Sequence, residues 1–367
     1  MRKEILLITR PITSPWDEAS KNFAFMLAKH ISQFTFHLLT CKSKKLHDIN
    51  CNVIQEPIYT SSQIDKIQKL ILLKNLIQDF KSVQIYHSLF TPSFWTSRIL
   101  KLIVKKYNKK SIQTAACFNI HSFRLKELFF ADLIITHSNY SKNILNKTGI
   151  LNVKTIYPGV DLDKFNPRVN IDYLKCHLGL SNENVILYPG EYARLGAVQV
   201  ITKSIPEIKK IIPNIKFIFA CRIKTVRDQR IEQKTKNLLK EKNLLDSVVF
   251  LNTVEDMPAL INLSTLCIFP VEEMTGKFDL PMVLLECLAC GKPIVITDIE
   301  PLNEIIKDEV GIKIKPGNYD ELTQAIVKII KDQELRKKMS YKCLKVADEF
   351  FNIKKTAQNY SKVYEEI

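Results

Sequence analysis

Short apolar runs alternate with longer helical stretches along this chain, and the alternation is found in both halves. The expected strands of the first half are EILLIT, FTFHLLT, SVQIYH, IQTAACF, LIITHS and VKTIYP, and those of the second half are VILYPG, KFIFAC, VVFLN, LCIFPV and PIVITD. Helical patterns separate these runs, at residues 17–31, 63–80 and 94–107, and then at residues 198–211, 230–242, 281–289 and 319–331. Buried strands that alternate with helices indicate parallel sheets covered on both faces. Each half is therefore predicted to be a doubly wound α/β domain.

The length of 367 residues suits two domains better than one. Between the halves, the segment YPGVDLDKFNP combines prolines, a glycine and Asp or Asn residues, which is typical of turns. We expect a first domain over residues 1–165 and a second over residues 166–348. A C-terminal helix, residues 349–367, is expected to pack back on the first domain.

The net charge of +16 is concentrated in the first half. Residues 1–168 hold 25 Lys and Arg against 11 Asp and Glu, a balance of +14, whereas the remainder holds 54 − 25 = 29 against 38 − 11 = 27, a balance of +2. A basic surface attracts anionic lipid headgroups, phosphates or nucleic acid. A Lys- and Ile-rich composition is the alternative explanation, but it does not account for the asymmetry. Nucleic-acid binding is disfavoured, because the basic residues lack interleaved aromatics on a recognisable motif.

The segment RILKLIVKKYNKK, residues 98–110, is the part of the first half best suited to contact an anionic membrane surface. Its basic residues include Lys101, Lys105, Lys106, Lys109 and Lys110. The alternative is an ordinary helix that buries Ile99, Leu102 and Ile103 in the core. The sequence leaves both interpretations open.

Cysteine usage and hydropathy favour a cytoplasmic protein. No run of about 18 apolar residues is present, so no transmembrane helix is expected. The apolar stretch in the opening MRKEILLITR is too short for the hydrophobic region of a signal peptide, and no small-residue cleavage site follows it, so it is interpreted as the first buried strand. Nine cysteines, an odd number without a paired Cys-x-x-Cys array, favour core thiols in a reducing compartment.

Two common nucleotide-binding signatures are absent. All nine glycines lie at or after Gly149, so the first strand runs into RPITSPWDEASKNF without the glycines of a dinucleotide fingerprint. The phosphate-binding pattern GxxxxGK[ST] is also missing. These absences argue against an NAD- or FAD-dependent dehydrogenase and against an NTP-hydrolysing enzyme.

The loop after the first strand is a candidate acceptor pocket, because ligands of such folds bind at the carboxyl ends of the strands. The residues assigned to it are Pro15, Trp16, Asp17, Ser20, Lys21 and Asn22. The structural alternative is a helix capped by Asp17, with Phe23, Leu27 and Ile31 in the core. Both descriptions can hold together.

The segment EEMTGKFDLPMVLLECLACGKP, residues 272–293, carries the main candidate site. Pro281 stands at a natural first helical position, and Gly291 is a helix stop. The N–H groups at such a helix start suit a diphosphate, and Lys277 adds a positive charge. Glu286 lies among apolar residues, where a carboxylate needs hydrogen-bond donors such as a ribose diol. A structural carboxylate held by backbone amides is the alternative.

Two arginines extend this site. Arg194 follows the strand VILYPG in the loop PGEYARLGA, and Arg222 follows the strand KFIFAC. Both are expected at carboxyl ends of neighbouring strands, where they can neutralise a diphosphate. With Lys277 they form a set of three positive charges around one expected phosphate position.

At these residues the chain resembles the group 1 (family 4) retaining glycosyltransferases of GT-B fold. Three segments carry the resemblance in order: LIITHSNYSKNILNKTG…VKTIYPGVDLDKFNP, LPMVLLECLACGKPIVITDIEPLNEII and FFNIKKTAQNYSKVYEEI. The resemblance covers nearly all of the chain. It implies two Rossmann-like doubly wound domains that face a central cleft, with the donor on the second domain and the acceptor entering from the first.

The resemblance assigns roles residue by residue. Glu286 matches the second glutamate of the family's E-x7-E motif, which holds the nucleotide ribose. Glu304 matches the glutamate of a later turn. The remaining positions assigned to the nucleotide sugar are Gly190, Asn252, Thr253, Val254, Leu280, Pro281 and Leu285.

The chain departs from the family pattern at several positions. The first glutamate of E-x7-E falls at Phe278, so its role is missing or has moved to Asp279. Glu191 stands near the expected position of a family arginine, and SPWDEASKN replaces a Gly-Gly loop. His87 matches a family histidine and is the candidate for contact with the sugar near the anomeric centre. A hydrogen-bonded structural histidine is the alternative for His87.

The resemblance implies a retaining, metal-independent transfer of a hexose from a UDP- or GDP-sugar, with His87 and Asp279 in catalytic roles and no further cofactor. The acceptor is expected to be a hydroxyl of a glycan or a lipid-linked glycan, with the protein in the cytoplasm or at the inner face of a membrane. The departures favour one alternative, a non-catalytic GT-B subunit or sugar-binding module. An epimerase or a phosphorylase requires acid–base residues or a cofactor lysine that the sequence does not provide.

Overall fold

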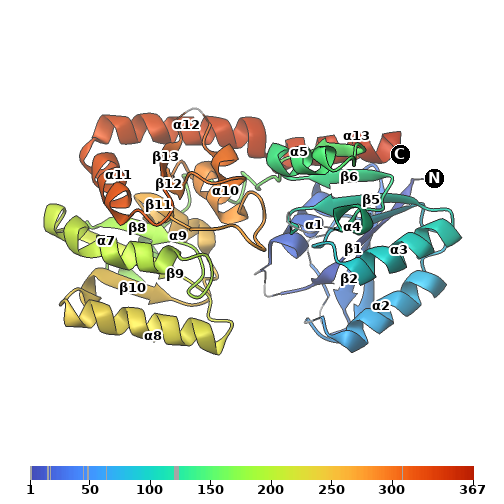
Figure 1. The fold of residues 1–367 in the computed structure, drawn as a ribbon, viewed down its shortest axis with the longest axis horizontal. Helices are drawn as coiled ribbons and strands as arrows, with labels where there is room; N and C mark the ends of the chain where they lie inside the picture. The colour runs from blue at the N-terminus through green and yellow to red at the C-terminus, as the bar shows by residue number, and fades with distance from the viewer. Residues whose placement is uncertain are drawn as a thin grey trace. The chain divides into compact units, whose positions relative to one another are not determined.

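The computed structural model describes residues 2–14, 16, 18–43, 45–47, 49–62, 64–119, 124–307 and 309–367. Within these ranges the chain forms two compact units, each built on a parallel sheet (Figure 1). Unit 1 comprises Met1–Gly159, Gly276–Asp279 and Asn352–Ile367, and unit 2 comprises Val160–Thr275 and Leu280–Phe351. The two sheets with their helices confirm the prediction of two Rossmann-like domains.

The described strands of unit 1 form a seven-stranded sheet in the order β3-β2-β1-β4-β5-β6-β7. These strands are β1 (Glu4–Ile12), β2 (Thr35–Cys41), β3 (Val53–Tyr59), β4 (Ile85–Ser88), β5 (Lys110–Ala115), β6 (Leu133–Thr136) and β7 (Val153–Thr155). The helices are α1 (Ala19–His30), α2 (Lys66–Gln78), α3 (Phe94–Lys106), α4 (Leu125–Leu128), α5 (Asn139–Lys147) and the C-terminal α13 (Ile353–Glu366). From β1 the chain adds β2 and β3 on one side and then returns to add β4 to β7 on the other, so the order of addition reverses between β1 and β4.

The described strands of unit 2 form a six-stranded sheet in the order β10-β9-β8-β11-β12-β13. These strands are β8 (Asn184–Tyr188), β9 (Ile215–Ala220), β10 (Val248–Leu251), β11 (Leu266–Phe269), β12 (Ile294–Thr297) and β13 (Gly311–Ile314). The helices are α6 (Asp172–His177), α7 (Ala197–Ile211), α8 (Val226–Glu241), α9 (Met257–Leu263), α10 (Met282–Ala289), α11 (Tyr319–Lys331) and α12 (Gln333–Phe351), with short 3₁₀ turns η1 (Leu245–Ser247) and η2 (Leu302–Ile305). The order reverses between β8 and β11, and open α/β sheets bind ligands at such a switch point.

Two strands were not predicted, β3 and β13, and both lie at sheet edges. β3 contains Pro57, and its middle residues, from Ile54 to Pro57, are exposed or half-buried, so it lacks the continuous apolar run of a central strand. An edge strand tolerates proline because its outer N–H groups have no ladder partner. β13 is only four residues long and begins at Gly311. The apolar pattern therefore missed two edge strands that lack a continuous buried run.

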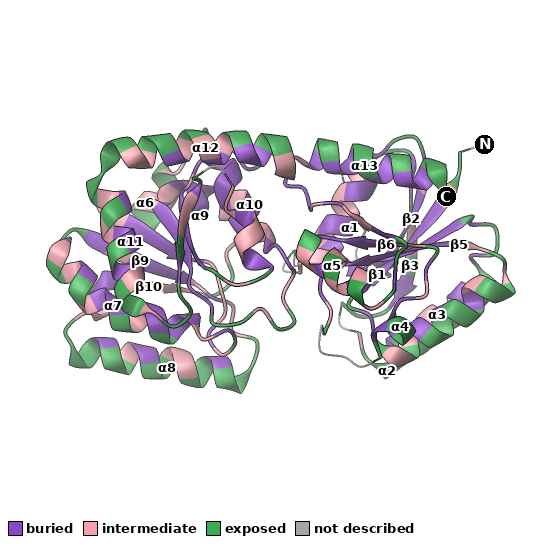
Figure 2. Ribbon diagram, turned by 45° about the horizontal axis from the view of Figure 1, so that its top comes forward, coloured by how far each residue is buried: buried purple, intermediate pink, exposed green. Residues whose placement is uncertain are grey.

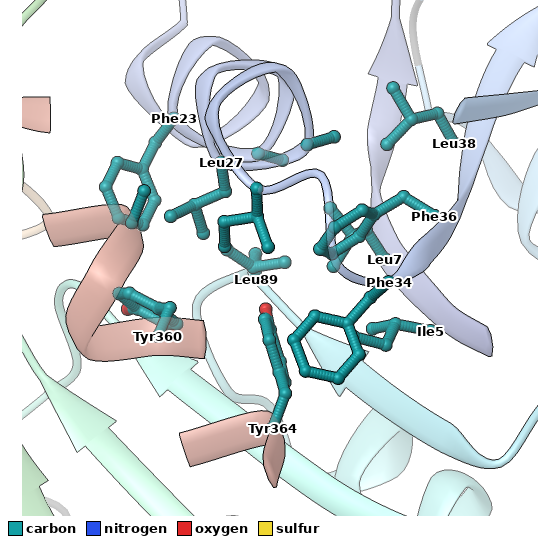
Figure 3. Close-up of a cluster of buried hydrophobic side chains, with 14 of the residues drawn as sticks. Ile5, Leu7, Phe23, Leu27, Phe34, Phe36, Leu38, Leu89, Tyr360 and Tyr364 are labelled. Carbon is teal, nitrogen blue, oxygen red and sulfur yellow. The ribbon is translucent and has the colours of Figure 1, made fainter. Parts of the chain in front are cut away.

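The last helix, α13, is part of the core of unit 1. Tyr360 and Tyr364 are fully buried, and Figure 3 shows both rings among apolar side chains of α1, β1 and the neighbouring loops. The Tyr364 ring lies edge-on to Phe34 with ring centroids 5.5 Å apart, and the Tyr360 ring lies edge-on to Phe23 at 5.8 Å. α13 thus contributes two large aromatic side chains, together with Ile353, Ala357 and Val363, to a core whose remaining members lie between Ile5 and Ile156.

The buried strands and half-exposed helices of each unit appear in Figure 2. Among the nine cysteines, Cys51 and Cys176 are exposed and the other seven are buried. None of the helices formed by the described residues is both long and apolar enough to cross a bilayer.

Candidate functional site

The loops at the carboxyl ends of the unit 2 strands are joined to one another by hydrogen bonds. The N–H of Glu272, after β11, donates to the carbonyl of Leu195, after β8, at 2.7 Å. The N–H of Ile223, after β9, donates to Oδ1 of Asn252, after β10, at 2.9 Å. The first of these bonds connects the two strands that flank the switch point. The loops therefore form one linked edge where the fold favours a ligand.

Asp228 connects the loop after β8 to the loop after β9. Its carboxylate accepts from the N–H groups of Ala193 at 3.2 Å, Lys224 at 3.2 Å and Thr225 at 2.9 Å. The Thr225 hydroxyl donates as well, at 2.8 Å. Burial raises the pKa of Asp228, but these hydrogen bonds outweigh burial and hold the pKa below its usual value. Asp228 is therefore a charged linker of the loops that carry Arg194 and Arg222.

The sequence interpretation did not identify Asp228, although a signal for it exists. Thr225 and Asp228 form a capping box at the start of α8, in which each side chain bonds the backbone of the other. The spacing T-x-x-D at the end of a predicted strand is visible in the sequence. The hydrogen bond between Asp228 and Ala193 depends on tertiary structure and cannot be seen in the sequence.

Gly196 allows the loop after β8 to approach the loop after β11. Its φ is +74°, a left-handed conformation that glycine adopts without strain. A Cβ at this position would lie 2.5 Å from the carboxyl carbon of Glu272. Any larger residue would separate the two loops at the switch point.

Arg194 forms a bidentate ion pair with Glu191 on its own loop, Nε to Oε2 at 2.7 Å and a terminal nitrogen to Oε1 at 3.1 Å. The Arg194 side chain remains 48% exposed. Arg222 is half-buried, and burial lowers the pKa of its guanidinium. The structure thus places both arginines on linked loops of unit 2, with the charge of Arg194 partly balanced by Glu191.

Glu286 lies on α10, whose other face buries Leu284, Leu285 and Leu288. Its side chain is half-buried, and no hydrogen bond or ion pair to it is found among the described residues. Desolvation raises its pKa to about 7, and the positive charge of Lys164 only partly opposes this. Such a carboxylate is poorly solvated, so hydrogen bonds from hydroxyl donors stabilise its charged form.

α10 begins one residue later than predicted, at Met282, with Pro281 as its N-cap. The described side chains provide no cap to the first N–H groups of this helix. Leu280 and Leu285 are fully buried, so they support the helix from the core. Gly190 packs on the ring of Tyr188, where a Cβ would come within 2.1 Å.

The turn after β10 lies on the same linked edge. Asn252 and Thr253 are exposed, and Val254 is half-buried. The Asn252 side chain holds the loop after β9 through Ile223, as described above. Unit 2 therefore brings together the predicted nucleotide residues Arg194, Arg222 and Asn252 on adjoining loops.

Lys277 and Asp279 belong to the segment that is part of unit 1. Ser138, at the end of β6, donates its hydroxyl to the Asp279 carboxylate at 2.5 Å, and the Asp279 N–H donates to the Ala116 carbonyl at 2.8 Å. Asp279 is only 6% exposed. The predicted set of three positive charges is thus divided, with two arginines in unit 2 and Lys277 in unit 1.

His87, the candidate for contact with the sugar, lies in the core of unit 1. His87 is fully buried, with Nδ1 2.7 Å from the Tyr364 hydroxyl and Nε2 2.8 Å from the Thr114 hydroxyl. Burial lowers its pKa to about 3, with a smaller contribution from nearby His137. Both ring nitrogens are occupied inside the core, as the structural alternative for this residue requires. The signal that was missed is the pair of tyrosines on α13.

The predicted acceptor loop is described in part. Asp17 and Pro15 lie outside the described residues. Trp16 is 44% exposed, and its carbonyl accepts from the Asn22 side chain at 3.1 Å. Lys21 is buried, and burial lowers its pKa. The helix pattern is correct in burying Phe23, Leu27 and Ile31, but the N-cap of α1 is Glu18.

In the part of the chain that the structure describes, no three His, Cys, Asp or Glu side chains gather in a way that could hold a metal ion.

Comparison with known families gives a match over the part of the chain that contains most of this site. Residues 175–345 match the model described as glycosyl transferases group 1. This span runs from α6 into α12 and includes Arg194, Arg222 and Glu286.

Three curated relatives have similar sequences. Alpha-D-kanosaminyltransferase of Streptomyces kanamyceticus is 23% identical over 197 residues, 53% of this chain and 48% of that protein. UDP-Gal:alpha-D-GlcNAc-diphosphoundecaprenol alpha-1,3-galactosyltransferase of Escherichia coli is 26% identical over 225 residues, 58% of this chain and 54% of that protein. An uncharacterized glycosyltransferase of Methanocaldococcus jannaschii is 25% identical over 362 residues, 93% of this chain and 92% of that protein. The chain thus spans about half the length of the first two relatives.

Solved structures share the fold. A glycosyltransferase from Rickettsia africae has a TM-score of 0.80 at 18% identity, covering 100% of this chain and 98% of its own. Anabaena Alr3699/HepE in complex with UDP-glucose has a TM-score of 0.78 at 16% identity, covering 99% of this chain and 100% of its own. The parallel sheets of the two units are those of the GT-B fold. The fold, the family match over residues 175–345 and these relatives make the chain similar to the group 1 glycosyltransferases.

Proposed function

We propose that the protein transfers a hexose from a nucleotide-diphosphate sugar to a hydroxyl acceptor, with retention of the anomeric configuration. The observation that carries the proposal is the linked edge of unit 2: Arg194 follows β8 and Glu286 lies on the helix after β11, the two strands at the switch point, and Arg222 follows the adjacent β9. In open α/β sheets this edge is the expected ligand position.

Glu286 is assigned to the nucleotide ribose. A half-buried carboxylate without donors loses water hydrogen bonds and regains none. The two hydroxyls of a ribose diol supply two O–H donors of the kind that a carboxylate accepts strongly. Its raised pKa is consistent with a group that is desolvated before the ligand arrives.

The diphosphate is assigned to Arg194, Arg222 and the uncapped start of α10. Guanidinium groups bind phosphate oxygens through paired N–H donors, and a helix start adds N–H groups and the positive end of the helix dipole. Negative charge on the diphosphate increases as the glycosidic bond breaks. These groups therefore stabilise the transition state more than the bound donor.

The proposed reaction breaks the bond between the anomeric carbon and the diphosphate oxygen. The acceptor oxygen bonds to the same face of that carbon, and its proton passes to the leaving phosphate. This route uses no protein nucleophile and no metal ion. Since His87 is enclosed in the core, no proton is routed through it.

We propose a UDP-sugar as the donor, because the similar Anabaena structure is a complex with UDP-glucose. As the acceptor we propose a glycan or lipid-linked glycan, because the Escherichia coli relative is named for a diphosphoundecaprenol-linked acceptor. Both assignments are inferences from those proteins.

The test is calorimetric titration of the purified protein with UDP-, GDP- and ADP-glucose. We expect saturable binding of the UDP-sugar, weakened roughly 10- to 100-fold by Glu286→Ala, since a hydrogen bond to a charged group contributes about 1.5–3 kcal/mol. Glu241→Ala, on the exposed end of α8, is the control and should leave binding unchanged. No nucleotide binding, or equal affinities for the two variants, would reject the proposed site. Proton NMR of the product and an assay with EDTA test retention and metal independence.

One alternative function has a specific observation in its favour. Asp279 follows Phe278, the position at which the family motif has its first glutamate. Its carboxylate is buried and accepts a hydrogen bond from the Ser138 hydroxyl. A non-catalytic module would bind the nucleotide sugar yet neither transfer nor hydrolyse it. Prolonged incubation with donor and a panel of acceptors distinguishes the two, because any release of UDP excludes the non-catalytic module.

A further inference from the structure

Large apolar side chains are exposed along two helices of unit 1, α2 and α3. On α2 they are Ile67 at 65% exposure, Leu70 at 66% and Ile77 at 38%. On α3 they are Trp95 at 71%, Ile99 at 38% and Leu102 at 69%. Their spacings, i, i+3 and i+10 on α2 and i, i+4 and i+7 on α3, place each set along one side of its helix.

The two helices cover the same face of the sheet. Leu76 of α2 and Leu100 and Ile103 of α3 belong to one buried cluster with side chains of β1 and β4. The Tyr107 hydroxyl, just after α3, donates to the Ile77 carbonyl at 3.2 Å. Figure 1 shows α2 and α3 side by side, and Figure 2 shows the outward side of α3 exposed. The two apolar stripes therefore belong to one surface, the α2–α3 face.

This concentration is unusual for scattered surface residues. Six of the fourteen exposed large hydrophobic residues in the described ranges lie on these helices, which have 13 residues each. Single exposed apolar residues need no explanation, whereas contiguous ones mark interaction surfaces. A shallow hollow on α2, lined by Leu70, Leu73, Lys74, Ile77 and Gln78, adds to the same patch.

The α2–α3 face is also strongly basic. Neither helix contains an acidic residue, and their basic residues are Lys66, Lys69, Lys74, Arg98, Lys101, Lys105 and Lys106. The sequence from Phe80 to Lys126 has no Asp or Glu and nine basic residues: Lys81, Arg98, Lys101, Lys105, Lys106, Lys109, Lys110, Arg124 and Lys126. The partner of this face must therefore offer negative charge together with an apolar layer.

We propose that the α2–α3 face docks on the surface of an anionic lipid bilayer. Lysines and arginines attract acidic headgroups, while apolar side chains and a tryptophan enter the boundary between headgroups and acyl chains. The phosphates of a nucleic acid would pair with the basic residues, but a nucleic acid offers no apolar layer into which Leu70, Trp95 and Leu102 could insert. One interpretation of the sequence placed Ile99 and Leu102 in the core, whereas both are exposed in the structure.

The face reaches the edge of unit 1 where the predicted acceptor loop lies. α3 begins at Phe94, shortly after β4 ends at Ser88, so Trp95 on its first turn is near the carboxyl edge of the sheet. The loop after β1, which contains Trp16, follows a strand adjacent to β4 on the same edge. Docking brings this edge to the headgroup layer. The docking rests on the surface alone, and only its link to a lipid-linked acceptor depends on the proposed function.

The test is sedimentation of the full-length protein with phosphatidylcholine vesicles, with and without phosphatidylglycerol. We expect binding to the anionic vesicles only, weakened by added salt. Lys101→Glu with Lys105→Glu should weaken binding by at least 20-fold, because each lysine near an anionic surface contributes roughly a fivefold factor. Lys240→Glu with Lys242→Glu, on unit 2, is the matched charge control and should retain binding.

Apolar insertion has its own pair of variants. Leu102→Asp should reduce vesicle binding about tenfold or more, by loss of a buried leucine, whereas Leu151→Asp, at a residue 77% exposed elsewhere in unit 1, should not. Tryptophan fluorescence should shift to the blue on vesicle addition in the wild type, and Trp95→Phe should reduce this shift, with Trp16 as the remaining tryptophan.

Several outcomes would overturn the proposal: equal binding to neutral vesicles, equal loss in the face variants and their controls, or binding to RNA or an acidic polypeptide in place of vesicles. A dimer that dissociates on Leu102→Asp would assign the face to a second copy instead. Affinity for UDP-glucose without vesicles should be the same in all these variants. Failure of docking is thereby distinguished from failure of the nucleotide site.

Discussion

Asp228 accepts a hydrogen bond at 3.2 Å from the backbone N–H of Ala193, which lies 35 residues earlier in the chain. The same carboxylate holds the N–H groups of Lys224 and Thr225, so a single side chain fixes two loops of the candidate site. Asp228 itself carries no assignment to the ligand. Its effect on nucleotide binding should therefore come from the positions of Arg194 and Arg222.

Asp228→Asn should raise the KM for the nucleotide sugar about tenfold and leave kcat within about twofold. An amide presents N–H donors where the backbone N–H groups need an acceptor, so the loops lose their shared anchor at a cost of about 1–3 kcal/mol. Steady-state kinetics with UDP-glucose at saturating acceptor provide the measurement.

A matched variant separates positioning from simple destabilisation. Thr225→Val removes the side-chain cap of α8 and should lower the free energy of unfolding by about 0.5–2 kcal/mol. The bonds of Asp228 to Ala193 and Lys224 remain, so the KM should stay near the wild-type value. If both variants raise KM in proportion to their loss of stability, Asp228 has no positioning role.

The affinity for UDP-glucose should increase as the pH rises towards 8. Glu286 has a pKa of about 7 in the free protein, so it is about half protonated at neutral pH. A ribose diol donates to the charged form, so binding lowers the pKa and releases a proton. Below pH 7 affinity should fall by up to tenfold per pH unit until the pKa of the complex is reached. Calorimetry between pH 5.5 and 8 in buffers of different ionisation enthalpy measures both the affinity and the number of protons released on binding.

Glu286→Gln is the control for this pH dependence, because the amide does not titrate. Its affinity should be lower at pH 8 and nearly constant across the range. A wild-type curve as flat as that of Glu286→Gln would mean that Glu286 does not contact the ligand.

Glu191→Gln should tighten binding of UDP about two- to fivefold. Glu191 partly neutralises Arg194 through their bidentate pair, and exposed pairs of this kind are worth about 0.2–1 kcal/mol. Removing the negative charge leaves the guanidinium more attractive to a diphosphate, most clearly at low salt. Glu207→Gln, which breaks the Glu207–Lys210 pair of the same i,i+3 spacing on α7, should have no effect. Weaker binding in Glu191→Gln would show instead that Glu191 holds Arg194 in its working position.

Local pattern was sufficient to predict the buried strands of both sheets and the helix that carries Glu286. The buried strands are continuous apolar runs, and the turn residues around α10 mark its ends. Long-range contacts were not predictable in this way. Asp228 looks like an ordinary helix cap until the loop at Ala193 is placed beside it. His87 resembles a ligand-binding residue until Tyr364, 277 residues later, is found bonded to its ring.

Two fully buried histidines, His87 and His137, should make stability fall as the pH is lowered. His87 and His137 are fully buried, and burial lowers the pKa of each from 6.5 to about 3. The unfolded chain then binds protons below pH 6.5 that the folded chain does not bind until pH 3, so stability is lost between these limits. At pH 5.5 the two together should lower the free energy of unfolding by roughly 2.5–3 kcal/mol relative to pH 7.5. Glu286 acts in the opposite direction because its pKa is raised, so the measurement is made in Glu286→Gln.

His137→Phe in the same background should reduce this pH-dependent loss by about half. The His137 ring packs against Phe23 at 4.9 Å and Phe278 at 5.7 Å, and its nitrogens have no hydrogen-bond partner among the described residues. Phenylalanine fits the same aromatic surroundings and removes two buried polar atoms, so stability at pH 7.5 should be unchanged or higher. Urea unfolding at the two pH values gives both quantities. An unchanged pH dependence, or a loss of stability at pH 7.5, would show that the His137 nitrogens do bind a partner in the folded protein.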